Sequence, residues 1–161
     1  MAIAGAAASL LFLASLISSA RAQVVNDGAT VILNHVTNTI SGGVTVGTNG
    51  PFTLLVLTNG TLLTNSGTGT IGVNASANSN TVRVTSANTR WLMSSDVTIG
   101  SNGSVNHLVI TNGARVENNF GALGIGAGSS NNDAISKANI YVPPKRSNSK
   151  FAIDCVFCPS T

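Results

Sequence analysis

The feature of this sequence that most constrains its fold is an internal repeat. Residues 97–113, VTIGSNGSVNHLVITNG, match residues 44–60, VTVGTNGPFTLLVLTNG, at ten of seventeen positions without a gap. The second stretch begins at Val97 and the first at Val44, so the offset, 97 minus 44, is 53. Because a repeat specifies the architecture of the whole chain, it takes priority over local signals.

The repeat divides into a shorter module that two series of residues mark. Steps of an aliphatic residue followed by glycine recur at Val46-Gly47, Ile71-Gly72, Ile99-Gly100 and Ile125-Gly126, with spacings of 25, 28 and 26. Steps of an aliphatic residue followed by threonine recur at Leu57-Thr58, Val84-Thr85 and Ile110-Thr111, with spacings of 27 and 26. Both series indicate a module of about 26 residues, which we interpret as one coil of a winding chain.

Short runs within each module have the composition of β-strands. Residues 54–57, 81–84 and 108–110 are rich in Val, Leu, Ile and Thr and are bounded by Gly, Asn or Ser. Side chains alternate along a strand, so every second residue of a run faces the same side. Four Asn-Gly pairs, beginning at residues 49, 59, 102 and 112, supply residues that accept the positive φ of sharp corners.

Asn-Gly between strands also signals β-hairpins, which makes an antiparallel meander the alternative fold. The recurrence of like residues at the coil period favours parallel stacking instead. We therefore predict an all-β fold, a right-handed parallel β-solenoid of about four coils. Its inward columns are Leu57, Val84 and Ile110 on one side and Val46, Ile71, Ile99 and Ile125 on another.

The start of the chain predicts export. Residues 1–22 read as a signal peptide, with a short apolar centre and Ala20-Arg21-Ala22 as the small-residue cleavage site. An uncleaved membrane anchor is the alternative, although the apolar run is too short to span a bilayer. We expect a secreted or cell-surface location, with no membrane contact after cleavage.

The remaining chain divides into three segments. Residues 23–43 are an irregular first coil or cap, in which Ile32 takes the position that Leu57 has in the next coil. Residues 44–136 are the solenoid repeats. Residues 137–161 form a basic tail with prolines and cysteines, and Pro143-Pro144 ends any strand there.

The charge distribution argues against nucleic-acid binding. Only 8% of the residues are charged, whereas 43% are hydrophobic. Between residues 23 and 136 three basic residues face four acidic ones, so the net charge of +3 comes from Arg21 and the tail. A nucleic-acid interface needs a basic face, usually with aromatic residues for single strands.

Few residues could carry chemistry. Cys155 and Cys158 form a single CxxC without further zinc ligands, so a disulfide or free thiols are expected. His35 and His107 are interpreted as surface positions away from any acidic cluster. The separation of Asp96 and Glu117, 117 minus 96, is 21, which does not stack the two carboxylates at the coil period.

Other patterns also favour structural roles. The segment 121–128 fits no phosphate-loop spacing, and Asp133 stands alone rather than in a calcium-binding repeat. Trp91 is more typical of a core position than of a sugar platform. A column of Thr58, Thr85 and Thr111 lacks the second threonine column that ice binding requires.

Residues 89–132 resemble the bacterial repeat associated with autotransporters and PEP-CTERM proteins. The resemblance is carried by Trp91, Val97–Gly100, Leu108–Gly113, Val116, Ile125-Gly126 and Gly128–Asn131. The chain shows neither a recognisable translocator barrel nor a PEP-CTERM sorting tail, so the resemblance implies no particular export route.

The resemblance implies an extracellular β-solenoid on a bacterial surface. We expect a non-enzymatic structural and adhesive module with no catalytic, cofactor or metal residues. A secreted solenoid that binds or cleaves carbohydrate is the alternative. The expected partners are further copies of the chain, joined end to end, or surface glycans.

Overall fold

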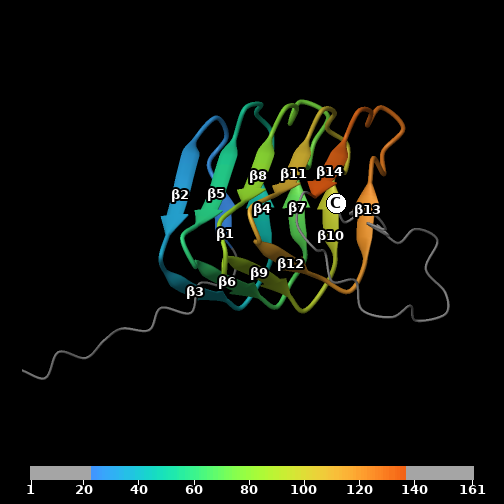
Figure 1. Ribbon diagram of the computed structural model, residues 1–161. Helices are drawn as coiled ribbons and strands as arrows, with labels where there is room; N and C mark the ends of the chain where they lie inside the picture. The colour runs from blue at the N-terminus through green and yellow to red at the C-terminus, as the bar shows by residue number, and fades with distance from the viewer. Residues whose placement is uncertain (1–22, 137–161) are drawn as a thin grey trace, which may run out of the picture.

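The computed structural model describes residues 23–136, which form a three-sided parallel β-solenoid (Figure 1). No helix occurs in these residues, and therefore none that could cross a membrane. The predicted signal peptide and the predicted tail lie outside the described residues.

Each coil contributes one strand to each of three sheets. Sheet A contains β1 (Gln23–Val25), β4 (Val44–Val46), β7 (Gly69–Ile71), β10 (Val97–Ile99) and β13 (Gly121–Leu123). Sheet B contains β2 (Thr30–Asn34), β5 (Leu54–Thr58), β8 (Thr81–Val84), β11 (His107–Ile110) and β14 (Asp133–Ser136). Sheet C contains β3 (Thr37–Ile40), β6 (Leu62–Asn65), β9 (Arg90–Met93) and β12 (Arg115–Glu117).

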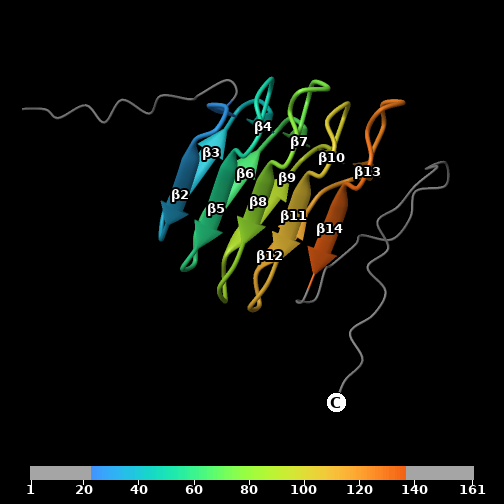
Figure 2. The same ribbon diagram turned by 90° about the horizontal axis from the view of Figure 1, so that it is seen from above.

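Every strand pairs in parallel with its counterpart in the neighbouring coil, which excludes the antiparallel meander. Figure 2 shows the strands of successive coils side by side along the solenoid axis. Paired residues are between 21 positions apart, as for Gln23 and Val44, and 28 apart, as for Gly69 and Val97. The described residues make about five turns, one more than expected from the sequence.

The predicted inward columns form part of the core. Leu57 pairs with Val84 and Val84 with Ile110, and all three are buried. Val46, Ile71 and Ile99 form the second column and are fully buried. Full burial of one such aliphatic side chain contributes roughly 1.5–3 kcal/mol, so each column adds several kcal/mol to the apolar stabilisation of the core.

Two assignments to these columns are wrong by a small register shift. Ile125 is exposed, and Leu123 pairs with Ile99 in its place, because the coil from β10 to β13 is shorter than the inner coils. Ile32 pairs with Val56 on the outer face, and Leu33 is the counterpart of Leu57. The regular coil period therefore holds for the inner coils and fails by one or two positions near the ends.

The indole of Trp91 lies in the core, where it cannot serve as a sugar platform. Trp91 is fully buried between Leu63 and Val116, its partners in sheet C. Its Nε1 donates a hydrogen bond of 2.8 Å to Oδ1 of Asn65, so the one polar atom of the ring is satisfied. A Cβ at Gly69 would lie 2.8 Å from Cζ2 of Trp91, so glycine makes room for the indole.

The side chain of Asp27 covers backbone amides at the N-terminal end of the solenoid. In the third coil, the amides of Val73 and Asn74 donate to carbonyls of the preceding coil. In the second coil, the equivalent amides of Thr48 and Asn49 donate instead to Oδ1 and Oδ2 of Asp27, at 2.7 and 3.0 Å. The carboxylate thus replaces the carbonyls that a preceding strand would supply, as a cap does.

These hydrogen bonds change the acidity of Asp27. Desolvation raises its pKa, but hydrogen bonds from the amides of Asn49, Thr48 and Gly50 together lower it by more, and the net pKa lies below the usual value. A carboxyl whose pKa is lower in the folded state stabilises that state above the unfolded-state pKa of about 3.9. The stabilisation is lost as the pH falls through the folded-state pKa.

We expect Asp27→Asn to lower the melting temperature at pH 7, because the amide group brings N–H donors toward the amides of Thr48 and Asn49. The difference from the unmodified chain should shrink as the pH falls below about 4 and Asp27 becomes protonated in both states. Thermal unfolding followed by circular dichroism between pH 7 and pH 2 measures this difference. Asp96→Asn is the matched control, and an equal effect of both substitutions at pH 7 would contradict the capping role.

Candidate functional site

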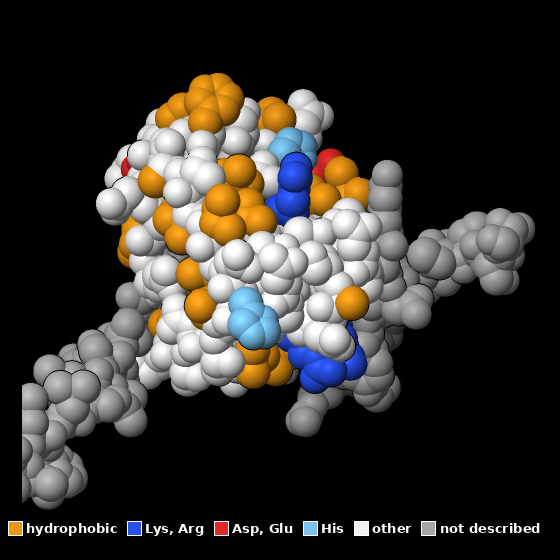
Figure 3. Space-filling view, turned by 60° about the vertical axis from the view of Figure 1, so that its left-hand side comes forward, with side chains coloured by type: hydrophobic (Ala, Val, Ile, Leu, Met, Phe, Trp, Pro, Cys, Tyr) orange, Lys and Arg blue, Asp and Glu red, His pale blue; other side chains and the backbone are white. Residues whose placement is uncertain are grey.

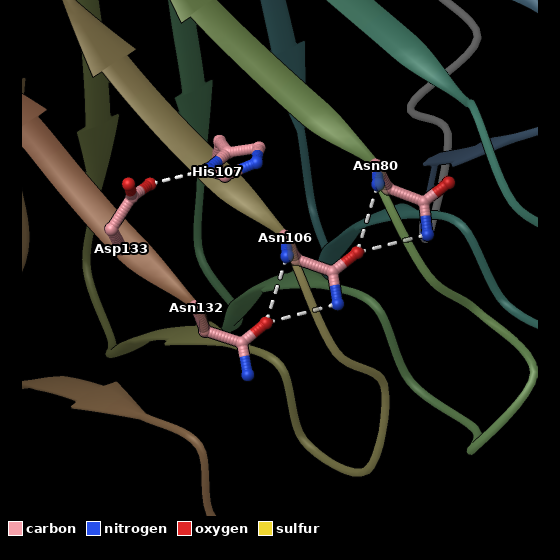
Figure 4. Close-up of polar contacts among 5 residues, drawn as sticks. All are labelled: Asn80, Asn106, His107, Asn132 and Asp133. Carbon is pink, nitrogen blue, oxygen red and sulfur yellow. Dashed lines mark hydrogen bonds and ion pairs between the residues drawn. The ribbon is translucent and has the colours of Figure 1, made fainter. Parts of the chain in front are cut away.

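The most extensive polar cluster in the described residues is a ladder of asparagine side chains at the corner between sheets A and B. Asn80, Asn106 and Asn132 immediately precede β8, β11 and β14, and consecutive members are 26 positions apart. Oδ1 of Asn106 accepts hydrogen bonds from the backbone N and from Nδ2 of Asn80, at 2.9 and 3.0 Å. Oδ1 of Asn132 accepts the same two bonds from Asn106, at 2.9 and 3.1 Å (Figure 4).

Both ends of the ladder bond to other groups of the protein. Oδ1 of Asn80 accepts from the backbone N of Thr53 at 2.8 Å, and Oγ1 of Thr53 accepts from the N of Gly28 at 3.0 Å. At the other end, Nδ2 of Asn132 donates to Oγ of Ser129 and to the carbonyl of Gly103. Thr53, Asn80 and Asn106 are buried, so the ladder is an internal element of the fold.

Glycines make the space that the ladder fills. Gly47, Gly72 and Gly100 have φ values of 75°, 75° and 72°, a region that residues with a side chain rarely adopt. A Cβ at Gly47 or Gly72 would collide with the amide group of Asn80 or Asn106 respectively. The repeated aliphatic-glycine step of the sequence is therefore the complement of the asparagine ladder: the aliphatic residue fills the core and the glycine admits the amide.

A second polar contact joins β11 and β14 on the outer face of sheet B. Nδ1 of His107 lies 2.5 Å from Oδ1 of Asp133, its register partner (Figure 4). The two side chains are 31% and 44% exposed, so the pair is open to solvent. The interpretation of His107 as a surface position away from any acidic cluster did not include this contact with a single carboxylate. The missed signal was their separation by one coil period, which stacks them in neighbouring coils.

The pair of His107 and Asp133 continues in register to a hydroxyl on the neighbouring strand β8. Thr81 is the register partner of His107 on the other side, which places a hydroxyl, an imidazole and a carboxylate in one column. No hydrogen bond joins Thr81 to His107 within residues 23–136. Activation of that hydroxyl by His107 would need a hydrogen bond between the two, because a general base must lie within hydrogen-bond reach of the group it activates.

The other residues considered from the sequence remain apart. Asp96 lies just before β10 and Glu117 ends β12, where it forms an ion pair of 3.0 Å with Arg115. His35 is exposed and contacts the carbonyl of Asn59. In the described part of the chain no three His, Cys, Asp or Glu side chains gather as a metal site would require.

The threonine and glycine patterns also have structural explanations. Oγ1 of Thr111 donates to Oγ1 of Thr85 at 3.0 Å, so part of the predicted column is a hydrogen-bonded ladder between coils. The segment 121–128 forms β13 and the turn after it. The cysteines of the CxxC lie outside the described residues.

The asparagine ladder was not predicted as a unit. Asparagine was interpreted as a corner residue, which is right for Asn59 and Asn112, whose φ values are 53° and 55°. The distinguishing signal was the recurrence of asparagine at the coil period at positions 80, 106 and 132, each time directly before a strand. A residue that recurs in this way on the inner side of a corner is expected to stack with its copies.

Comparisons of the chain with protein-family models, with characterised proteins and with solved structures gave no match. The resemblance to the autotransporter-associated repeat is therefore supported at the level of the fold alone, by the parallel β-solenoid.

We expect Asn106→Ala to lower the free energy of unfolding by about 3 kcal/mol or more. The substitution leaves the buried backbone N–H and the buried Nδ2 of Asn80 without their acceptor, and each buried orphan group costs about 1–3 kcal/mol. Oδ1 of Asn132 loses Nδ2 of Asn106 as a donor but keeps the backbone N–H of residue 106. Urea unfolding followed by circular dichroism measures the loss.

The matched control is Asn74→Ala. Asn74 also donates its Nδ2 to an asparagine of the preceding coil, Oδ1 of Asn49 at 2.6 Å, but on the exposed surface. We expect a loss below about 1 kcal/mol, because water replaces an exposed partner. Equal losses in the two variants would show that burial does not make the ladder important.

Proposed function

We propose that the chain is a non-enzymatic structural and adhesive repeat module of an exported cell-surface or matrix protein. The observation that carries the proposal is that polar side chains in the described residues mainly form hydrogen bonds between neighbouring coils. Amides and hydroxyls form ladders between coils, as in Asn80-Asn106-Asn132, and thereby support a rigid rod. The weakly charged composition and the predicted signal peptide support an extracellular place for it.

The positions of the four acidic residues between residues 23 and 136 weigh against the carbohydrate-cleaving alternative. Glycoside hydrolysis generally needs two carboxyl groups that flank one bond, about 5–10 Å apart. Asp27 follows β1, Asp96 precedes β10, Glu117 lies in sheet C and Asp133 in sheet B. Each of the four lies at a different part of the coil, and three of them already bond to other groups of the protein.

A depolymerisation assay together with a glycan array tests this function. We expect the secreted chain to release no reducing ends from any polysaccharide, whether or not it is retained on glycans. His107→Gln and Asp96→Ala should leave any glycan retention unchanged. Turnover that either substitution abolishes would contradict the proposal and favour an enzyme.

We also propose that the coils associate end to end. The core residues that stay partly exposed all lie in the first or last coil: Ala29, Val31, Leu33, Leu123 and Ala134. An end coil also presents strand edges that offer unpaired backbone groups to another chain. A second copy stacked on the end would cover both the edges and these apolar side chains.

We expect Leu123→Lys to weaken this association, because it places a charge among the apolar side chains of the last coil. Ala122→Lys is the matched control, since Ala122 is the neighbouring residue of β13 and pairs with the outward Thr98. Sedimentation across a range of concentrations measures the association, and thermal unfolding verifies that both variants fold. A chain that is monomeric at all concentrations would overturn this proposal without affecting the assay of function.

A further inference from the structure

The outer face of sheet B carries an apolar column with one charge at its centre. Successive register partners on this face are Ile32, Val56, Arg83, Val109 and Ile135. The comparable outward column of sheet A has Thr45, Thr70 and Thr98 on its middle strands. Figure 3 shows hydrophobic side chains on both sides of a basic one on this part of the surface.

The apolar surface extends to the turn before β5. Phe52 is 71% exposed and has a φ of 60°, and Leu54 begins the strand beside it. A bulky residue with positive φ is uncommon, and exposure of a phenyl ring to water is energetically unfavourable. Together with the column, Phe52 gives this face an exposed apolar surface beside the His107–Asp133 pair, with Ile32 61% and Ile135 41% exposed.

Arg83 makes this face selective. Its side chain is exposed, and within residues 23–136 it forms no hydrogen bond or ion pair. A molecule that covered the column without an acceptor for Arg83 would bury an unpaired cation, which is costly. The matching partner is therefore an extended apolar segment with a carboxylate near its middle.

We propose that residues 151–157 of this same chain, FAIDCVF, dock on the outer face of sheet B with Asp154 opposite Arg83. In an extended segment the apolar Ala152 and Val156 lie on the same side as Asp154, which is the only acidic residue after Asp133 in the sequence. Its apolar-charge-apolar order is complementary to the order of the column. Arg and Asp would form an ion pair flanked by apolar contacts, the geometry in which such a pair is least screened.

The length of the connecting chain permits this docking. Sheet B ends with β14, and β8 with Arg83 lies two strands away, or about 10 Å at a strand spacing of about 4.8 Å. Asp154 follows Ser136 by eighteen positions, and a chain of that length can span up to about 60 Å when extended. Sheet B is therefore well within reach of the segment.

A second copy of the same face is a poorer occupant. A two-fold pairing centred on the middle strand would oppose two Arg83 side chains, and like charges in contact are unfavourable. Surface glycans would find one aromatic ring, Phe52, beside an aliphatic column that offers few hydrogen bonds. The chain's own segment provides both the carboxylate and the apolar side chains.

Cysteine cross-linking tests the docking in the chain from Gln23 to Thr161. Cys155→Ser and Cys158→Ser remove the native thiols, and Val156→Cys introduces one on the side of the extended segment that Asp154 occupies. A second cysteine is introduced as Val56→Cys or Val109→Cys, and under mild oxidation with diamide we expect one of these to form an intramolecular disulfide with the cysteine at position 156 at least tenfold faster than Thr70→Cys on sheet A. Peptide mass mapping identifies the linked pair.

Charge reversal provides the specific control. Arg83→Glu should remove the tenfold advantage, and Arg83→Glu combined with Asp154→Arg should restore it. Equal rates at sheets A and B would overturn the proposal, and so would an advantage that Arg83→Glu leaves unchanged. Disulfides that form only between chains would assign the face to a second copy instead and would also overturn it.

Discussion

The fold depends on the close packing of asparagine side chains against glycines at one corner of the coil. Three asparagine amides stack between sheets A and B, and three glycines with positive φ leave the volume that those amides occupy. The asparagine and the glycine depend on each other. A side chain in place of the glycine would collide with the asparagine amide, and without the asparagine a buried backbone N–H would lack its acceptor. The corner therefore sets both the turn of the chain and the alignment of consecutive coils.

The same alignment determines what the rest of the coil can contain. Once the coils are in register, side chains at equivalent positions of neighbouring coils stack on one another. Each position therefore favours residues that interact well with a copy of themselves. Aliphatic residues satisfy this condition inside, as Leu57, Val84 and Ile110 do, and hydroxyls satisfy it outside, as Thr85 and Thr111 do. Charged residues satisfy it poorly, which gives a physical reason for the low charge of the chain.

The columns of the inner coils were predictable from the sequence because an aliphatic residue before Gly or Thr is easy to recognise at a fixed period. The ends were less predictable because turns there differ in length, so Ile125 and Ile32 fell out of register while Leu123 and Leu33 took the inward positions. The contact of His107 with Asp133 needed only their spacing of one coil period, whereas the role of Asp27 needed the three-dimensional position of the amides that it caps. A spacing shows which residues stack, but it does not show where the regular pairing stops and a side chain must replace it.

The parallel winding also has a consequence for folding kinetics. Every strand pairs with a strand one coil away, so the chain closes loops of a single coil and no longer ones. The entropy of closing a loop grows with its length, so each added coil presents the same barrier as the one before. Folding can then start at any two neighbouring coils, and further coils add to them in both directions. A longer array of such coils would contain more starting points without containing a slower step, which sets this architecture apart from globular β-proteins, whose most distant pairings become slower to form as the chain lengthens.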